Sequence, residues 1–213
     1  MQYYQGGSME LTGSNDIRTA LRLVGELLAA DGLSLRIVVI GGAAMNLHGY
    51  AERTTTDVDI IAVDDRAANA NATMITAPPQ PLPDTIVQAI RIVARQRGLP
   101  DEWLNTGPAG QWLIGLPVGF ADRVVWPSTL DFGGLIVGLA GRSDLIAFKL
   151  FAAADHRDAH SVHYQDLRAL RPTLAELDAA VDWLVGQDQG PEWATTLERL
   201  MQYARRDAAN DWR

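Results

Sequence analysis

The chain has no cysteine, and among its 18 basic residues Lys149 is the single lysine. Without cysteine, disulfide bonds, thiolate metal sites and cysteine-based catalysis are excluded, and a reducing cytoplasm is the location that we expect. No apolar run approaches the roughly 20 residues that would span a bilayer, so we expect no membrane partner. The sequence shows no signal-peptide pattern.

Basic charge is also scarce, because the formal net charge is −8. A broad nucleic-acid surface needs many Lys and Arg side chains against phosphate, so this charge argues against one. Local basic patches are still open to the chain, although each is equally what an ordinary solvated helix face looks like. The candidate patches are Arg91 with Arg95 and Arg97, Arg168 with Arg171, and Arg205 with Arg206.

Hydrophobic residues make up 47% of the 213 residues, which is enough for a buried core. Apolar periodicity predicts a mixture of helices and short buried strands. The expected strands cover 35–40, 58–63, 123–126 and 135–139, and the expected helices cover 16–31, 43–47, 64–74, 84–98, 143–152, 165–170, 174–185 and 192–209. This order predicts an α+β fold, with a mixed sheet flanked by helices and a helical C-terminal part. We expect a sheet domain over 9–142 and a helical domain over 143–213.

One stretch carries more chemistry than the rest. An apolar run ends in Gly41-Gly42, a short helical stretch follows, and a second apolar run begins with Asp57-Val58-Asp59. Residues i and i+2 of a strand point to the same face, so the two aspartates would aim their carboxylates at one spot. Paired carboxylates repel each other unless a cation lies between them, and oxygen ligands suit Mg²⁺.

The glycines suit a phosphate, because a glycine-rich turn at a helix start lets backbone N–H groups approach one. Arg53 lies just before the aspartates and is a candidate phosphate ligand, or else a solvated loop residue. Either half of the motif alone has an ordinary structural explanation. Their conjunction at this spacing favours a site for Mg²⁺, or Mn²⁺, and a nucleoside triphosphate (NTP).

This stretch resembles the nucleotidyltransferase superfamily that includes DNA polymerase beta. The signature of that superfamily is Gly-Gly or Gly-Ser, a helix, and Asp-x-Asp on the next strand. Gly41, Gly42, Asp57 and Asp59 match it position for position. The resemblance implies the polymerase-beta-like sheet, with Asp57 and Asp59 as metal ligands. A third carboxylate often lies on a later strand in the superfamily, and Asp122 and Asp131 are the candidates here.

Two later segments narrow the resemblance. Residues 145–152 (LIAFKLFA) carry Lys149, and Arg157 and Asp166 follow; residues 99–105 (LPDEWLN) form a further motif. Together they are similar to the AbiEii/AbiGii toxin family of type IV-like toxin–antitoxin systems. The resemblance implies that Lys149 neutralises charge on the triphosphate and that Asp166 positions Lys149 or assists as a base.

The resemblance also implies an activity and partners. A nucleoside monophosphate would pass from an NTP to the 3′ end of tRNA, which blocks translation, and a cognate antitoxin protein would neutralise the toxin. Two other hypotheses are compatible with the same residues. The acceptor could be a protein or a small molecule such as an aminoglycoside, or the chain could be a non-catalytic module that binds a nucleotide or a partner.

Overall fold

The computed structural model describes residues 10–64, 81–155, 161–187, 190 and 192–213. These residues fall into two compact units. Unit 1 comprises the described residues up to Gly110 together with Trp126–Leu139, and unit 2 comprises Gln111–Val125 and the described residues from Ala140 onward. The predicted domain division between residues 142 and 143 stays a prediction.

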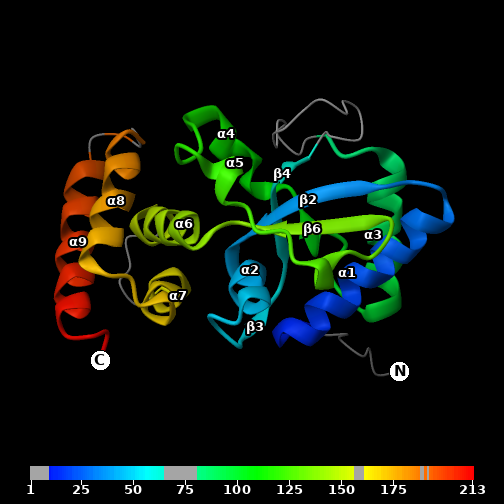
Figure 1. Cartoon of the computed structure of the whole chain (residues 1–213), viewed down its shortest axis with the longest axis horizontal. Coiled ribbons are helices and arrows are strands. Elements are labelled where there is room, and N and C mark those ends of the chain that lie inside the picture. The colour runs from blue at the N-terminus through cyan, green and yellow to red at the C-terminus, as the bar shows by residue number, and fades with distance from the viewer. Residues whose placement is uncertain (1–9, 65–80, 156–160, 188–189, 191) are drawn as a thin grey trace, which may run out of the picture. The chain divides into compact units, whose positions relative to one another are not determined.

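Unit 1 is built on a mixed sheet whose described strands run in the order β5-β4-β2-β6. Its strands are β2 (Leu35–Ile40), β4 (Val58–Val63), β5 (Leu104–Asn105) and β6 (Leu135–Leu139). The central pair, β2 and β4, is antiparallel, whereas β6 pairs with β2 and β5 pairs with β4 in parallel. A separate short ladder joins β1 (Leu11–Thr12) to β3 (Thr54–Thr55). Figure 1 labels β2, β4 and β6 side by side.

Three helices pack with this sheet: α1 (Gly13–Ala30), α2 (Gly41–His48) and α3 (Asp84–Arg97). The buried residues of α1 recur at helical spacing, and α1 contacts β6, α2 and α3. Helix α2 contacts both central strands, whose apolar side chains are buried except for the half-buried Leu35 and Val63. Two 3₁₀ turns, η2 (Gly107–Gly110) and η3 (Ser128–Leu130), belong to the same unit.

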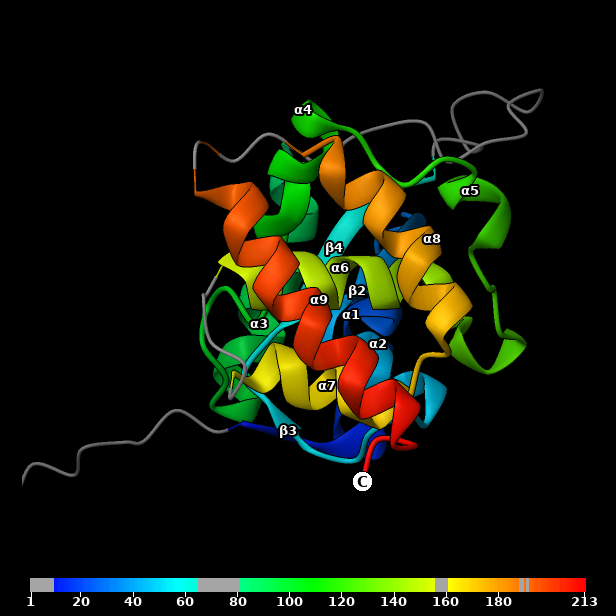
Figure 2. The ribbon, with the colours of Figure 1, turned by 90° about the vertical axis from the view of Figure 1, so that its left-hand side faces the viewer.

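Unit 2 is helical. It consists of α4 (Gln111–Ile114), α5 (Phe120–Arg123), α6 (Arg142–Asp155), α7 (Val162–Leu170), α8 (Leu174–Val185) and α9 (Trp193–Ala209). Helix α6 is the centre of the unit, because α7, α8 and α9 all contact it (Figure 2). Nine of its residues are buried, which explains why its sequence is apolar on nearly every side.

The structure confirms the α+β class, with a mixed sheet flanked by helices and a helical C-terminal part. The predicted strand over 123–126 is wrong, because α5 ends at Arg123 and Pro127 follows shortly, and proline cannot donate to a ladder. The predicted helix over 64–74 and Arg157 lie outside the described residues, apart from Asp64. No helix in the described ranges has the length and apolar character to cross a membrane.

Candidate active site

The Gly-Gly motif lies where β2 ends and α2 begins. Ile40, the last residue of β2, has an extended backbone, and Gly41 then takes a positive φ of 72°. A side chain at Gly41 would be strained by that φ, and it would also place a Cβ only 2.5 Å from Asp59 Oδ2. The reason for this close approach is the register, which pairs Ile40 with Asp59. The two halves of the predicted motif therefore lie next to each other in the fold.

The two aspartates lie at the start of β4. Asp57 immediately precedes the strand and Asp59 is its second residue, and both are half-buried. Val58 and Ile60 alternate with them and are fully buried, as the predicted two-residue period requires. The Thr55 hydroxyl donates to the Asp57 carbonyl oxygen at 3.2 Å and lies 3.4 Å from Asp57 Oδ1.

Arg53 lies against the second glycine. A Cβ at Gly42 would be 2.7 Å from Arg53 Nη2 and 3.0 Å from Thr55 Oγ1, so both side chains approach the start of α2. Asn46 holds this loop in place. Its Nδ2 donates to the Gly42 carbonyl oxygen, and its Oδ1 accepts from the Arg53 backbone N–H, both at 3.0 Å. The predicted nucleotide-binding trio of Gly41, Gly42 and Arg53 is thus brought together.

Two polar residues of this site have no predicted role in the sequence analysis. Thr55 bridges Gly42 and Asp57, and the Asn105 amide of β5 donates to Asp59 Oδ1 at 3.4 Å. The signal for Asn105 was present in the segment LPDEWLN, but its nearness to Asp59 depends on the strand order. Thr55 stands in a run of three threonines, and nothing in that run distinguishes it from its neighbours.

The residues present fit a small divalent cation. Asp57 and Asp59 supply oxygen donors beside a helix start, and Mg²⁺ is commonly held by one or two carboxylates together with substrate phosphates and water. No cluster of three or more His, Cys, Asp or Glu side chains suited to a metal occurs in the described part of the chain.

Neither candidate for a third carboxylate lies on a strand of the main sheet. Asp122 is exposed on α5, which belongs to unit 2. Asp131 follows η3 in unit 1, and its Oδ1 accepts from the Gly133 backbone N–H at 3.0 Å, which closes a tight turn.

A groove of about 980 Å³ opens beside the aspartates in unit 1. Asp57 and Asn105 line it together with an apolar part of α3. Arg91, Asp101 and Glu102 are exposed charged residues of its lining. Among the described residues of the lining, Asp57, Asp101 and Glu102 outnumber Arg91, so these residues combine an apolar wall with an excess of negative charge.

Lys149 and Asp166 form an ion pair within unit 2. Lys149 Nζ lies 2.6 Å from Asp166 Oδ2, and the two side chains are only 5% and 2% exposed. Lys149 lies on α6 and Asp166 on α7, which pack against each other. The structure thus shows Asp166 in contact with Lys149, and its role in positioning Lys149 for catalysis stays a prediction. That this pair contributes to the chemistry of Asp57 and Asp59 stays a prediction.

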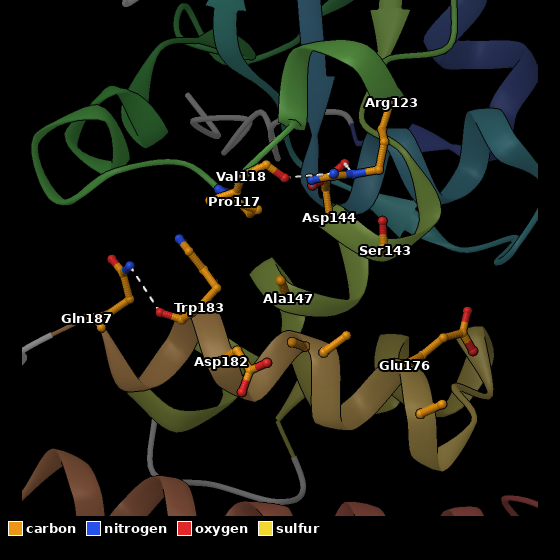
Figure 3. A pocket seen from close by; sticks show the side chains of 14 residues that line it. Pro117, Val118, Arg123, Ser143, Asp144, Ala147, Glu176, Asp182, Trp183 and Gln187 are labelled. Carbon is orange, nitrogen blue, oxygen red and sulfur yellow. Dashed lines mark hydrogen bonds and ion pairs between the residues drawn. The ribbon is translucent and has the colours of Figure 1, made fainter.

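Unit 2 also holds a pocket of about 740 Å³, with Trp183 on α8 and Gln187 just after that helix opposite Pro117 and Val118 (Figure 3). At one side, Arg123 binds the buried Asp144 carboxylate through both Nε and Nη2. Burial raises the pKa of the Asp144 carboxyl, whereas the hydrogen bond of Arg123 acts in the opposite direction. That same hydrogen bond raises the pKa of the Arg123 guanidinium.

The fold and site together define a class. A mixed sheet in which a Gly-Gly helix start meets an Asp-x-Asp strand fits the nucleotidyltransferase signature described above. Residues 20–174 match the model of a family described as nucleotidyltransferase of unknown function (DUF6036), and the chain belongs to this family. Neither a curated protein nor a solved structure matches the chain. The family match agrees with the predicted superfamily, and the toxin resemblance is a finer prediction.

Proposed function

We propose that the chain transfers a nucleoside monophosphate from an NTP to a hydroxyl acceptor, with Mg²⁺ or Mn²⁺ on Asp57 and Asp59. The observation that carries this proposal is the approach of Asp59 to Gly41, where a Cβ would lie 2.5 Å from the carboxylate. This approach joins a candidate phosphate-binding turn to a candidate metal-binding pair in one place. Neither half alone would indicate more than a turn or a strand end.

Each residue then has a role in positioning and charge neutralisation. The backbone N–H groups at the start of α2 approach the triphosphate, and the glycines leave room for it. Arg53 lies beside them as a phosphate ligand. When bound, Mg²⁺ would neutralise phosphate charge. From the family resemblance, Lys149 adds positive charge to the triphosphate and Asp166 holds Lys149 in place.

The proposed reaction is an in-line displacement. The acceptor hydroxyl oxygen forms a bond to the α-phosphorus, the bond from that phosphorus to the bridging oxygen breaks, and pyrophosphate leaves with its electron pair. The hydroxyl proton passes to solvent or to a nearby base. The acceptor that the toxin resemblance favours is the 3′ end of tRNA, with a cognate antitoxin as the protein partner. On this proposal, expression without the antitoxin arrests growth by blocking translation.

The direct test uses NTPs labelled at the α-phosphate, Mg²⁺ and deacylated tRNA. The expected result is label in tRNA with the wild-type chain and no label with Asp57→Asn or Asp59→Asn. Asp178→Asn is the matched control, because Asp178 is an exposed aspartate of α8 that pairs with Arg205. Incorporation that survives both site substitutions would show that the assignment of the carboxylates is wrong.

The groove of unit 1 favours a second candidate. Its lining near Asp57 includes Asp101 and Glu102 against Arg91, which suits a cationic acceptor better than a polyanion. An aminoglycoside or a basic protein segment is such an acceptor. Incubating labelled NTPs with tRNA, an aminoglycoside panel and total protein in parallel separates the two candidates. Mg²⁺-dependent NTP binding without transfer to any acceptor would instead indicate a non-catalytic binding module.

A further inference from the structure

Asn105 reaches the carboxylate site from the neighbouring strand. Strands β5 and β4 are parallel, and their register places Asn105 opposite Asp59. The Asn105 Nδ2 donates to Asp59 Oδ1 at 3.4 Å. Facing residues of adjacent strands send their side chains to the same side of the sheet, so this contact follows from the register itself.

The orientation of the Asn105 amide is fixed by a second bond. The Gly107 backbone N–H donates to Asn105 Oδ1 at 2.7 Å. Because the amide oxygen is engaged there, the NH₂ group is the end that faces Asp59. A Cβ at Gly107 would lie 2.9 Å from Asn105 Oδ1, so a side chain there would push the amide from its present position. Asn105 therefore presents Asp59 with a donor.

The segment that carries Asn105 is firmly anchored in unit 1. Trp103 is fully buried, and its Nε1 donates to the Ile90 carbonyl oxygen of α3 at 3.2 Å. The Val58 backbone N–H donates to the Trp103 carbonyl oxygen at 2.6 Å. These contacts tie β5 to both α3 and β4, so the position of Asn105 relative to Asp59 is set by the fold of the unit.

The Asp59 carboxylate thus has a close neighbour at each oxygen. Oδ2 lies against Gly41, and Oδ1 accepts from Asn105. We infer that Asn105 is a positioning residue for the divalent cation, because its amide donor orients the Asp59 carboxylate. This inference rests on the proposed function, because it takes Asp57 and Asp59 as the cation ligands.

The role of Asn105 can be tested by measuring how tightly the metal-free chain binds Mn²⁺. Free Mn²⁺ is measured by electron paramagnetic resonance. Groups that orient a metal ligand typically contribute 10- to 100-fold in metal affinity, so Asn105→Ala should weaken Mn²⁺ binding by about tenfold or more. Asn105→Asp keeps an acceptor for Gly107 but removes the donor to Asp59, so it should weaken Mn²⁺ binding as well. Asn210→Ala, which removes an amide from unit 2, should bind Mn²⁺ as the wild type does.

A purely structural Asn105 gives a different result. In that case Asn105→Ala lowers the thermal midpoint of the metal-free chain and leaves the Mn²⁺ affinity of the folded chain within about twofold of wild type, which overturns the inference. If Asn105→Ala does not fold, Asn105→Asp decides, and an Mn²⁺ affinity equal to or above that of wild type overturns the inference. Failure of the proposed function gives a different result. In that case the wild-type chain binds no Mn²⁺, or the Asp57→Asn and Asp59→Asn variants bind it as tightly as the wild type does.

Discussion

A buried carboxylate is costly unless a cation stays beside it, and Lys149 is that cation for Asp166. Removing one partner of a buried pair typically costs about 3–5 kcal/mol, because the other charge stays buried without it. We therefore expect Lys149→Met to lose about 3 kcal/mol of unfolding free energy, as measured in urea.

The double substitution Lys149→Met with Asp166→Leu removes both charges and should recover much of that loss. A single substitution that costs less than about 1 kcal/mol would contradict the importance of the pair. The result also governs how activity is interpreted. An inactive Lys149 variant is evidence for a catalytic role only when the chain is shown to be folded.

Gly41 and Gly49 allow backbone strain to be separated from contact with Asp59. Both have a positive φ, 72° and 79°, and both flank α2. A Cβ at Gly49 meets nothing within 4 Å, whereas a Cβ at Gly41 meets Asp59 Oδ2. Each Gly→Ala change should cost about 1–2 kcal/mol in unfolding free energy from the left-handed backbone. Only Gly41→Ala should also weaken Mn²⁺ binding, and equal affinities in the two variants would argue against a site at Asp59.

The sequence allowed half of this site to be predicted. Gly41, Gly42, Asp57 and Asp59 were accessible because a strand, a turn and a strand are local in sequence. Asn105 lies 46 positions from Asp59, and the two meet because β5 pairs with β4, which no local pattern encodes.

At the scale of single elements, Glu176 stabilises the start of α8. It completes a capping box with Thr173 and accepts from Arg142 Nε at 2.8 Å. The hydrogen bond from Arg142 is the main cause that lowers the pKa of the Glu176 carboxyl below its usual value of 4.5. The stabilisation is therefore complete above pH 4.5 and is lost as the pH falls through the lower folded-state pKa.

Thermal unfolding between pH 6 and pH 3 checks this assignment. The wild-type chain should lose a component of stability in the acid range that Glu176→Gln lacks, since glutamine does not titrate. Glu176→Ala should cost about 1 kcal/mol at neutral pH through the weakened cap. Parallel acid profiles for wild type and Glu176→Gln would contradict the pKa direction.

Elements with a strong local pattern were predicted closely. The predicted strands over 35–40 and 58–63 and the helix over 174–185 have the same bounds in the structure. Helix α1 starts earlier than predicted, at Gly13, where the Thr12 backbone N–H donates to Asp16. The predicted strand over 123–126 was wrong, and its first residue, Arg123, instead ends α5 and bonds to Asp144, a partner distant in sequence.

At the scale of the whole molecule, the net charge of −8 bears on the acceptor. Several arginines of the predicted basic patches are already engaged by carboxylates in the structure. The pairs are Arg97 with Asp16, Arg171 with Asp211, Arg205 with Asp178 and Arg206 with Asp207. Of the patch arginines, Arg91, Arg95 and Arg168 have no carboxylate at ion-pair distance within the described ranges.

Few phosphate contacts are therefore expected if tRNA is the acceptor. Each contact with a single strand contributes about −0.7 to the slope of log K against log salt, so three arginines give a slope of about −2. The slope is measured by fluorescence anisotropy of labelled tRNA at salt concentrations between 50 and 200 mM. Replacing Arg91 and Arg95 by Gln should flatten the slope to about −0.7, whereas Arg205→Gln, which removes an already paired arginine, should not change it.

A wild-type slope steeper than about −5 would require a basic surface that these arginines do not provide. A slope near zero, with transfer to a cationic acceptor, would favour the acidic groove beside Asp57 as the acceptor site.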